Sequence, residues 1–194
     1  MDLLLASTSP IRRTLLANAG VHCEALAPGV DEAAIKAGHG GSDDELAKAL
    51  ARAKALSISG DRPDAWVIGS DSLLSVDGRR FSKPRSREEA ADHLRFFSGK
   101  VMQLTSAVAL ARGGTVDWAI AEEARLRLRS LSETFIHSYL QDDWPEVSYC
   151  VGVFRLEGPG VQLFEAVEGD HFTVLGLPLL PLLSAFRQRG LLPS

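Results

Sequence analysis

Alternating runs of apolar and polar residues predict a chain in which strands and helices follow one another. The apolar run Leu3–Leu5 has the character of a buried strand, and the hydroxyl residues at 7–9 end it. Apolar residues then recur at helical spacing over 10–19, with Pro10 at the first helical position and Gly20 at the expected stop. The chain is therefore expected to begin with a strand, a polar loop and a helix.

Capping signals and apolar faces predict further helices and strands. Helices are expected after Ser42, Ser86 and Ser132 and before Gly190. Strands are expected at 65–69, at 101–112 and 115–131 around a Gly-Gly turn, and in a hairpin over 161–178. The glycines between 38 and 41 lack the lysine and spacing of a phosphate-binding loop and are interpreted as linker. Strands mixed with helices in this order predict an α/β architecture with a mixed sheet.

The composition is that of an ordinary folded protein. The 194 residues suffice for one sizeable domain or two closely packed lobes, and 45% hydrophobic with 24% charged residues is typical of a globular chain. Two cysteines without a C-x-x-C pair predict neither a disulfide framework nor a cysteine metal site. The first apolar run is too short for a signal peptide, and no stretch approaches the roughly 18 apolar residues of a membrane span. We therefore expect a cytoplasmic protein with no membrane partner.

The formal net charge of −4 narrows the choice of partners. A broad nucleic-acid surface needs clustered positive charge, so a nucleic-acid partner is not expected. A small basic nucleotide site remains compatible with an acidic chain, and acidic side chains are needed to hold a divalent metal.

The first candidate site is the start of the helix at 10–19. Ser9 is a suitable N-cap, and Arg12 and Arg13 lie on the first turn, where positive side chains oppose the helix dipole. Free backbone N–H groups, the hydroxyls and both guanidiniums would then converge on one phosphate-sized anion. Alternatively, both arginines are solvated surface residues and Ser9 is only a cap.

The second candidate site follows the strand at 65–69. Gly69 is expected to turn the backbone, which places Asp71 beyond the end of a buried strand, where α/β sheets bind ligands. Lys83 is a single cation shortly before the next helix. Each residue alone has a plainer interpretation, since aspartate at a strand end is commonly a turn former. A helix start suited to anions, a carboxylate and a lysine together suit phosphate chemistry with a divalent cation.

Several segments resemble the Maf family of septum-formation-inhibitor-like nucleotide pyrophosphatases in order and spacing. They are "LLLASTSPIRRTLLANAG", "PGVDE", "VIGSDSLLSVDGRRFSKP", "FFSGK" and "FEAVEGDHFTVLGLPL". The resemblance extends from Leu3 to about Leu183. It implies one domain over 1–194 made of two lobes, with an elongated mixed sheet and a deep cleft, and a homodimer. It also implies cleavage of nucleoside triphosphates, including noncanonical ones, to monophosphate and pyrophosphate with Mg²⁺, Mn²⁺ or another divalent cation.

The resemblance assigns roles to individual residues. Asp71 matches the proton acceptor, Glu32 a carboxylate that holds the metal together with Asp71, and Lys83 a catalytic lysine. The positions that bind substrate phosphates in the family correspond to Ser7, Ser9, Arg12, Arg13 and Lys54.

Three further positions are associated in the family with the choice of base, and here they are Ile11, Ser72 and Glu157. The branch that hydrolyses dTTP and UTP resembles Arg, Thr and Gln at these positions, and the 7-methyl-GTP branch resembles Trp, Gln and Glu. Glu157 favours the second branch, since a carboxylate accepts hydrogen bonds from the N–H edge of guanine. Ile11 lacks the aromatic surface on which a methylated base would stack.

The expected function is therefore a nucleoside triphosphate pyrophosphatase, favouring the 7-methyl-GTP branch. A nucleotide-binding regulator of cell division or septum formation, with little or no hydrolysis, is the alternative. It would need the phosphate-binding residues but neither Asp71 nor Glu32. A phosphatase that removes only the terminal phosphate is a third possibility, and its products would distinguish it.

Overall fold

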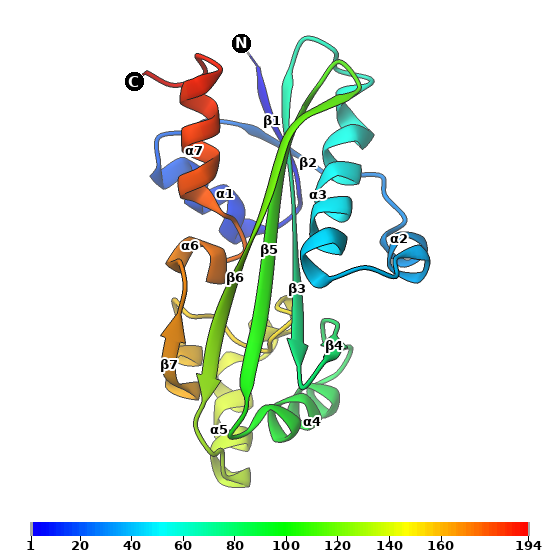
Figure 1. Ribbon diagram of the computed structural model, residues 1–194. Coiled ribbons are helices and arrows are strands. Elements are labelled where there is room, and N and C mark those ends of the chain that lie inside the picture. The colour runs from blue at the N-terminus through cyan, green and yellow to red at the C-terminus, as the bar shows by residue number, and fades with distance from the viewer. Residues whose placement is uncertain (1, 194) are drawn as a thin grey trace. The chain divides into compact units, whose positions relative to one another are not determined.

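The computed structural model describes residues 2–193, in which strands and helices alternate (Figure 1). The strands are β1 Leu3–Ala6, β2 Glu24–Leu26, β3 Trp66–Val76, β4 Arg79–Phe81, β5 Val101–Arg112, β6 Thr115–Leu128 and β7 Phe164–Glu168. The helices are α1 Pro10–Asn18, α2 Glu32–Gly38, α3 Asp43–Ser59, α4 Arg87–Phe97, α5 Glu133–Asp143, α6 His171–Val174 and α7 Leu179–Gln188. Two short 3-10 helices are η1 Glu146–Tyr149 and η2 Pro159–Leu163.

The strands form one mixed sheet in the order β2-β1-β3-β5-β6-β7, with β4 paired to β3. β1 runs parallel to β2 and β3, whereas β4 is antiparallel to β3 and β7 is antiparallel to β6. The predicted α/β architecture with a mixed sheet is therefore confirmed.

The chain divides into two compact units. Unit 1 comprises Met1–Ser72, Thr105–Glu122 and Asp170–Ser194, and unit 2 comprises Leu73–Leu104 and Glu123–Gly169. The chain passes from one unit to the other within β3 and β6, and between Leu104 and Thr105 within β5. The single domain and the deep cleft implied by the resemblance stay predictions.

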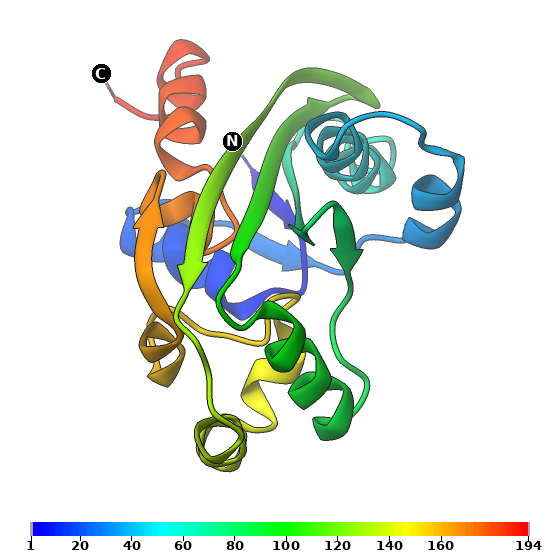
Figure 2. The same cartoon turned by 60° about the horizontal axis from the view of Figure 1, so that its bottom comes forward.

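In unit 1, helices cover both faces of the sheet (Figures 1 and 2). Leu15 and Leu16 of α1 and Phe186 of α7 join one apolar cluster with Leu5 of β1 and Ile68 of β3. Helix α3 covers the opposite face, and its apolar stripe is completely buried at Leu46, Leu50 and Ala51. In unit 2, α4 and α5 lie side by side (Figure 2).

Strand β3 is longer than the sequence predicted. We expected the backbone to turn at Gly69, but β3 continues through that residue to Val76. Gly69 has no positive φ and is paired with Ala6 of β1. Asp71 therefore lies within a strand and not beyond its end, and the prediction of a turn at Gly69 is wrong.

Two other expectations about local structure are wrong. The segment after β7 forms no hairpin: β7 pairs with β6, and Asp170 then caps α6 by accepting from the Phe172 and Thr173 amides. The glycine segment was interpreted as linker from residue 38 onward, but Gly38 is the last residue of α2. Helix α2 has no buried residue, so it carries no apolar periodicity that would have predicted it.

The capping signals in the sequence correctly predicted where three helices begin. Ser42 and Glu45 form the predicted capping box at the start of α3. Ser86 and Ser132 cap α4 and α5 by accepting from the amides of Glu89 and Phe135.

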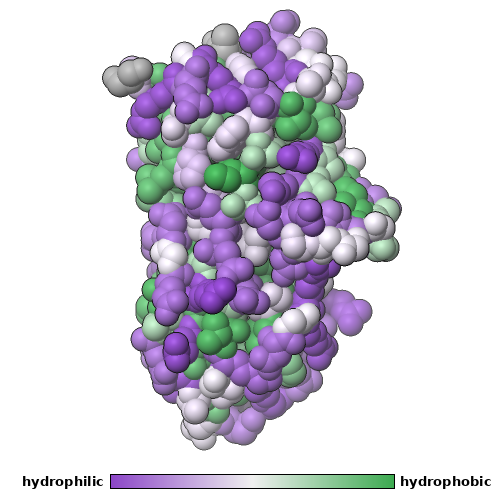
Figure 3. Space-filling view, viewed as in Figure 1, coloured by the Kyte–Doolittle hydropathy of each residue, from purple (hydrophilic) through white to green (hydrophobic). Residues whose placement is uncertain are grey.

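Among residues 2–193, no helix has the length and apolar character needed to cross a membrane. Hydrophilic residues dominate the face drawn in Figure 3, where hydrophobic residues form separate patches.

Candidate active site

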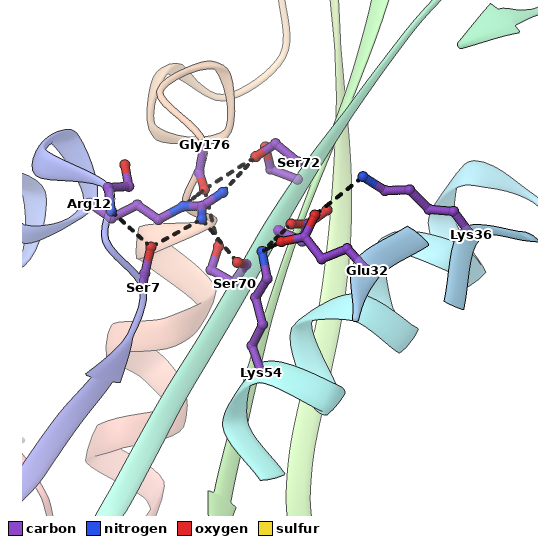
Figure 4. Close-up of polar contacts among 11 residues, drawn as sticks. Ser7, Arg12, Glu32, Lys36, Lys54, Ser70, Ser72 and Gly176 are labelled. Carbon is purple, nitrogen blue, oxygen red and sulfur yellow. Dashed lines mark hydrogen bonds and ion pairs between the residues drawn. The ribbon is translucent and has the colours of Figure 1, made fainter. Parts of the chain in front are cut away.

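Figure 4 shows the side chains of Lys54, from α3, and Glu32, from α2, pointing toward one another beside β3, and Lys54 also contacts Asp71 of β3. The Nζ atom of Lys54 lies 2.5 Å from Oδ1 of Asp71 and 2.7 Å from Oε1 of Glu32. The side chains of Lys54 and Asp71 are 9% and 8% exposed, whereas that of Glu32 is 40% exposed. One buried ammonium group therefore holds two carboxylates that the sequence placed far apart.

Gly69 explains how Lys54 reaches Asp71. Side chains two positions apart on a strand share a face, so Gly69 and Asp71 both face α3. A Cβ at Gly69 would collide with the carbonyl oxygen of Ala51 and lie 2.6 Å from the amide nitrogen of Ala55. The missing side chain lets α3 approach β3 closely and brings Lys54 to the carboxylate.

Helix α2 presents Glu32 to Lys54. Asp31 caps this helix by accepting from the amide of Ala34, and Glu32 is its first residue. The second carboxylate oxygen of Glu32 lies 3.2 Å from Nζ of Lys36, one turn further along. Burial raises the pKa of Glu32, but the hydrogen bonds and charges of Lys54 and Lys36 outweigh it and hold the pKa below its usual value. Glu32 is therefore ionised at neutral pH.

Arg12 occupies the opposite face of β3, where its guanidinium group is almost fully used by the protein itself (Figure 4). Nε donates to the carbonyl of Gly176 at 2.8 Å. Nη1 donates to the carbonyl of Ser70 at 2.9 Å and to Oγ of Ser7 at 3.4 Å, and Nη2 donates to Oγ of Ser72 at 3.0 Å. Of the five N–H bonds of this guanidinium, only one has no acceptor among these groups. Arg12 therefore joins the start of α1 to β3 and to the turn before α7.

Gly176 makes this arrangement possible. Its φ of +93° lies in the left-handed region that favours glycine. A Cβ there would lie 3.2 Å from Oγ of Ser72 and 3.6 Å from Nη2 of Arg12. The carbonyl of Gly176 also accepts from Oγ of Ser70 at 3.1 Å.

The structure does not bring the two arginines of α1 together. Arg12 is buried, so it is not a solvated surface residue, and its guanidinium group is not freely accessible to an anion. Arg13 is exposed and, together with Cys23, lines a cavity of about 350 Å³. Ser9 occupies the N-cap position, but its side chain forms no capping hydrogen bond, and its amide donates to Oγ of Ser7 at 3.2 Å. The hydroxyl of Ser9 therefore remains available at the start of α1.

Two predicted site residues belong to unit 2. Lys83 and Glu157 are both exposed and lie within electrostatic range of Cys150. Burial and the negative charge of Glu157 raise the pKa of Cys150 to about 11, while Lys83 lowers it. Lys83 and Glu157 are thus near a common residue, and their roles in catalysis and base choice stay predictions.

Sequence reasoning missed several polar residues of unit 1. Ser70 and Ser106 are completely buried, and Gly176 supplies a carbonyl that no side-chain pattern could reveal. Ile11, predicted to influence base choice, is partly buried and packs against the core of unit 1.

The two carboxylates fit a magnesium ion that is held partly by its substrate. No group of three or more His, Cys, Asp or Glu side chains able to hold a metal occurs within residues 2–193. Mg²⁺ is commonly bound through one or two carboxylates together with substrate phosphates. Asp71 and Glu32 supply such a pair, both turned toward Nζ of Lys54, itself a cation.

The mixed α/β sheet and the cluster of Lys54, Asp71 and Glu32 do not by themselves identify a family. Residues 2–189 match the family described as "Maf-like protein". The chain belongs to the Maf family.

Relatives match over almost the whole chain. A protein of Rhizobium meliloti named "7-methyl-GTP pyrophosphatase" is 46% identical over 97% of this chain and 96% of its own length. A protein of Nitrobacter hamburgensis named "Nucleoside triphosphate pyrophosphatase" is 48% identical over 98% of this chain and 95% of its own length. A solved structure titled "The structure of the Staphylococcus aureus Ham1 protein" covers 98% of this chain at 14% identity and a TM-score of 0.47, a likeness too low to support an inference.

Proposed function

We propose that this protein hydrolyses nucleoside triphosphates to the monophosphate and pyrophosphate. The observation that carries the proposal is the buried Lys54 ammonium bound to the carboxylates of Asp71 and Glu32. Membership of the Maf family supports it, as do the names of relatives that are 44–48% identical.

In this reaction Asp71 accepts the proton of the attacking water. The water oxygen forms a bond to the α-phosphorus, the bond between that phosphorus and the bridging oxygen breaks, and pyrophosphate leaves with the electron pair. Lys54 fixes the Asp71 carboxylate through Oδ1, which leaves Oδ2 for the water. A carboxylate that is positioned in this way acts as a general base.

A divalent cation, Mg²⁺ or Mn²⁺, would be held by Asp71 and Glu32. When bound, it supplies positive charge that offsets the charge of the triphosphate. Lys54 lies between the same carboxylates and offsets their negative charge before substrate arrives.

The start of α1 binds the phosphates in this proposal. Free N–H groups of a first helical turn attract anions, and the hydroxyl of Ser9 makes no capping bond there. Arg13, on the same first turn, is an exposed cation that supplements these groups. Arg12 and Ser7 act indirectly, by positioning neighbouring groups, because Arg12 donates to Ser7 and to three other groups of the protein.

For the base, we propose a preference for 7-methyl-GTP or a related guanine nucleotide. The carboxylate of Glu157 suits the N–H edge of guanine, and four of the relatives compared are named for 7-methyl-GTP. We further propose that the protein is a cytoplasmic homodimer without a nucleic-acid partner.

Product analysis tests the proposal. The protein is incubated with Mg²⁺ and dTTP, UTP, CTP, GTP or 7-methyl-GTP, and the products are separated by chromatography. Monophosphate with pyrophosphate is the expected result, fastest with 7-methyl-GTP. Diphosphate with inorganic phosphate would indicate a phosphatase. Nucleotide that stays bound and intact would favour the nucleotide-binding regulator.

A further inference from the structure

A chain of hydroxyl groups runs from Ser72 into the interior of unit 1. Oγ of Ser72 lies 2.9 Å from Oγ of Ser106, and Ser106 donates to the carbonyl of Thr173 at 2.9 Å. Ser106 and Thr173 are completely buried, and Ser72 is partly exposed. The chain ends at that carbonyl, and the hydroxyl of Thr173 separately donates to Glu122 at 2.7 Å.

The single proton of each hydroxyl group fixes the direction of this chain. Ser106 has one proton, and the carbonyl of Thr173 takes it, because a carbonyl oxygen can only accept. Ser106 must then accept from Ser72, so the proton of Ser72 points into the protein. The other acceptor near Ser72, the carbonyl of Gly176, is 3.5 Å away and already accepts from two groups at 2.8 and 3.1 Å.

Arg12 completes the arrangement from the other side. Its Nη2 donates to Oγ of Ser72 at 3.0 Å, so one lone pair of Ser72 is used. The Ser72 hydroxyl is left with one lone pair and no proton to offer. A ligand group that meets it must therefore be a hydrogen-bond donor.

We propose that Ser106 is a positioning residue that holds Ser72 as a hydrogen-bond acceptor for an N–H or O–H group of the substrate. This inference rests on the proposed function, since it concerns how a nucleotide is recognised. Phosphate oxygens of a triphosphate offer no proton, so Ser72 recognises the base or the sugar. Candidate donors are the 2-amino group of guanine, the N3–H of uracil and the 2′-hydroxyl of ribose.

Matched pairs of nucleotides, each differing in one donor, test this inference. GTP and ITP differ in the 2-amino group, GTP and dGTP in the 2′-hydroxyl, and UTP and 3-methyl-UTP in the N3–H. We measure kcat and KM for each pair with the native protein, Ser106→Ala and Ser106→Thr. For at least one pair, the native protein should prefer the donor-bearing member by about tenfold, the effect of one hydrogen bond to a desolvated partner.

Ser106→Ala releases the proton of Ser72, which can then rotate toward the ligand. The preference should fall to within about threefold, mainly through KM, and Ser106→Thr should restore it because it keeps the hydroxyl. Ser59→Ala is the matched control, because Ser59 is also completely buried and its hydroxyl has no hydrogen-bond partner. That control should leave every ratio unchanged, and thermal unfolding verifies that all variants are folded.

Two results would overturn the inference. One is an equal loss of kcat/KM for both members of every pair in Ser106→Ala, which a purely structural role would produce. The other is a native protein that discriminates none of the pairs. If the native protein cleaves no nucleotide, the proposed function fails. Dissociation constants for the same pairs then test the inference: tighter binding of the donor-bearing member supports an acceptor at Ser72, and equal binding of both members contradicts it.

Discussion

The Nζ atom of Lys54, in the middle of α3, lies 2.5 Å from Oδ1 of Asp71, in the middle of β3. Both side chains are less than 10% exposed. Removing two charges from water is unfavourable, and close pairing compensates for it only when both partners are present. Each residue therefore depends on the other for stability as well as for any chemistry.

Replacing Lys54 should destabilise the fold. Lys54→Met leaves the Asp71 carboxylate buried without its cation, and we expect the free energy of unfolding to fall by about 3 kcal/mol. Lys48→Met is the control on the same helix, because Lys48 pairs with Asp44 where the two side chains are 28% and 49% exposed. That exposed pair should change stability by less than about 1 kcal/mol. Urea unfolding of both variants measures the difference, and equal losses would contradict the pairing argument.

Gly69 should resist substitution although its backbone is ordinary strand. Gly69→Ala forces α3 away from β3, and we expect a loss of at least about 2 kcal/mol, as for other overpacked cores. A Cβ at Gly60, which follows α3, would meet no atom within 4 Å. Gly60→Ala should therefore be neutral or slightly stabilising. Denaturant unfolding checks both, and a neutral Gly69→Ala would show that the close approach of α3 is not required.

Some parts of this arrangement followed from the sequence and others did not. Ser42 with Glu45 is a local signal, so the start of α3 was predictable. The length of β3 was not predictable, because in the sequence Gly69 resembles a turn residue. Its contact with α3 is visible only once the helix is packed against the strand. Local patterns carry no information about such long-range packing.

The burial of Arg12 illustrates the same limit. Its acceptor at Gly176 is a backbone carbonyl 164 positions away, which no motif around residue 12 can indicate. The resemblance to the Maf family, in contrast, named Asp71 and Glu32 as the metal-holding carboxylates and Lys54 as a substrate-binding residue. The structure brings these three residues together.

The contribution of Glu32 to stability should depend on pH. Its pKa is lowered in the folded state, so its contribution is complete above the usual pKa of glutamate, about 4.3, and is lost as the pH falls through the folded-state pKa. The difference in unfolding free energy between the native protein and Glu32→Gln should be constant from pH 7 to about 5.5 and should shrink below pH 4. In a Lys54→Met background this pH dependence should weaken. A difference that grows as the pH falls would contradict the sign of the shift.

Gly176 should matter for function as well as stability. Gly176→Ala introduces a side chain at a φ of +93° and presses on the hydroxyl of Ser72. Gly190→Ala is the control, since Gly190 also has a positive φ, +67°, but a Cβ there would meet no atom within 4 Å. Both should lose about 1 kcal/mol of stability for the backbone alone. Only Gly176→Ala should also lower kcat/KM for nucleotide, by about tenfold. Steady-state kinetics measures kcat/KM for both variants, and equal values would contradict this prediction.

The most direct measurement is the rate of pyrophosphate release by Asp71→Asn. Asparagine keeps the shape of the side chain but neither accepts the proton of water nor bears the charge that a metal requires. Asp77→Asn is the matched control at the end of the same strand, where Asp77 is 60% exposed and pairs with Lys100. We expect kcat to fall at least about 100-fold in Asp71→Asn and to remain at the native value in Asp77→Asn. Near-native turnover by a folded Asp71→Asn variant would contradict the assignment of Asp71 as the catalytic base.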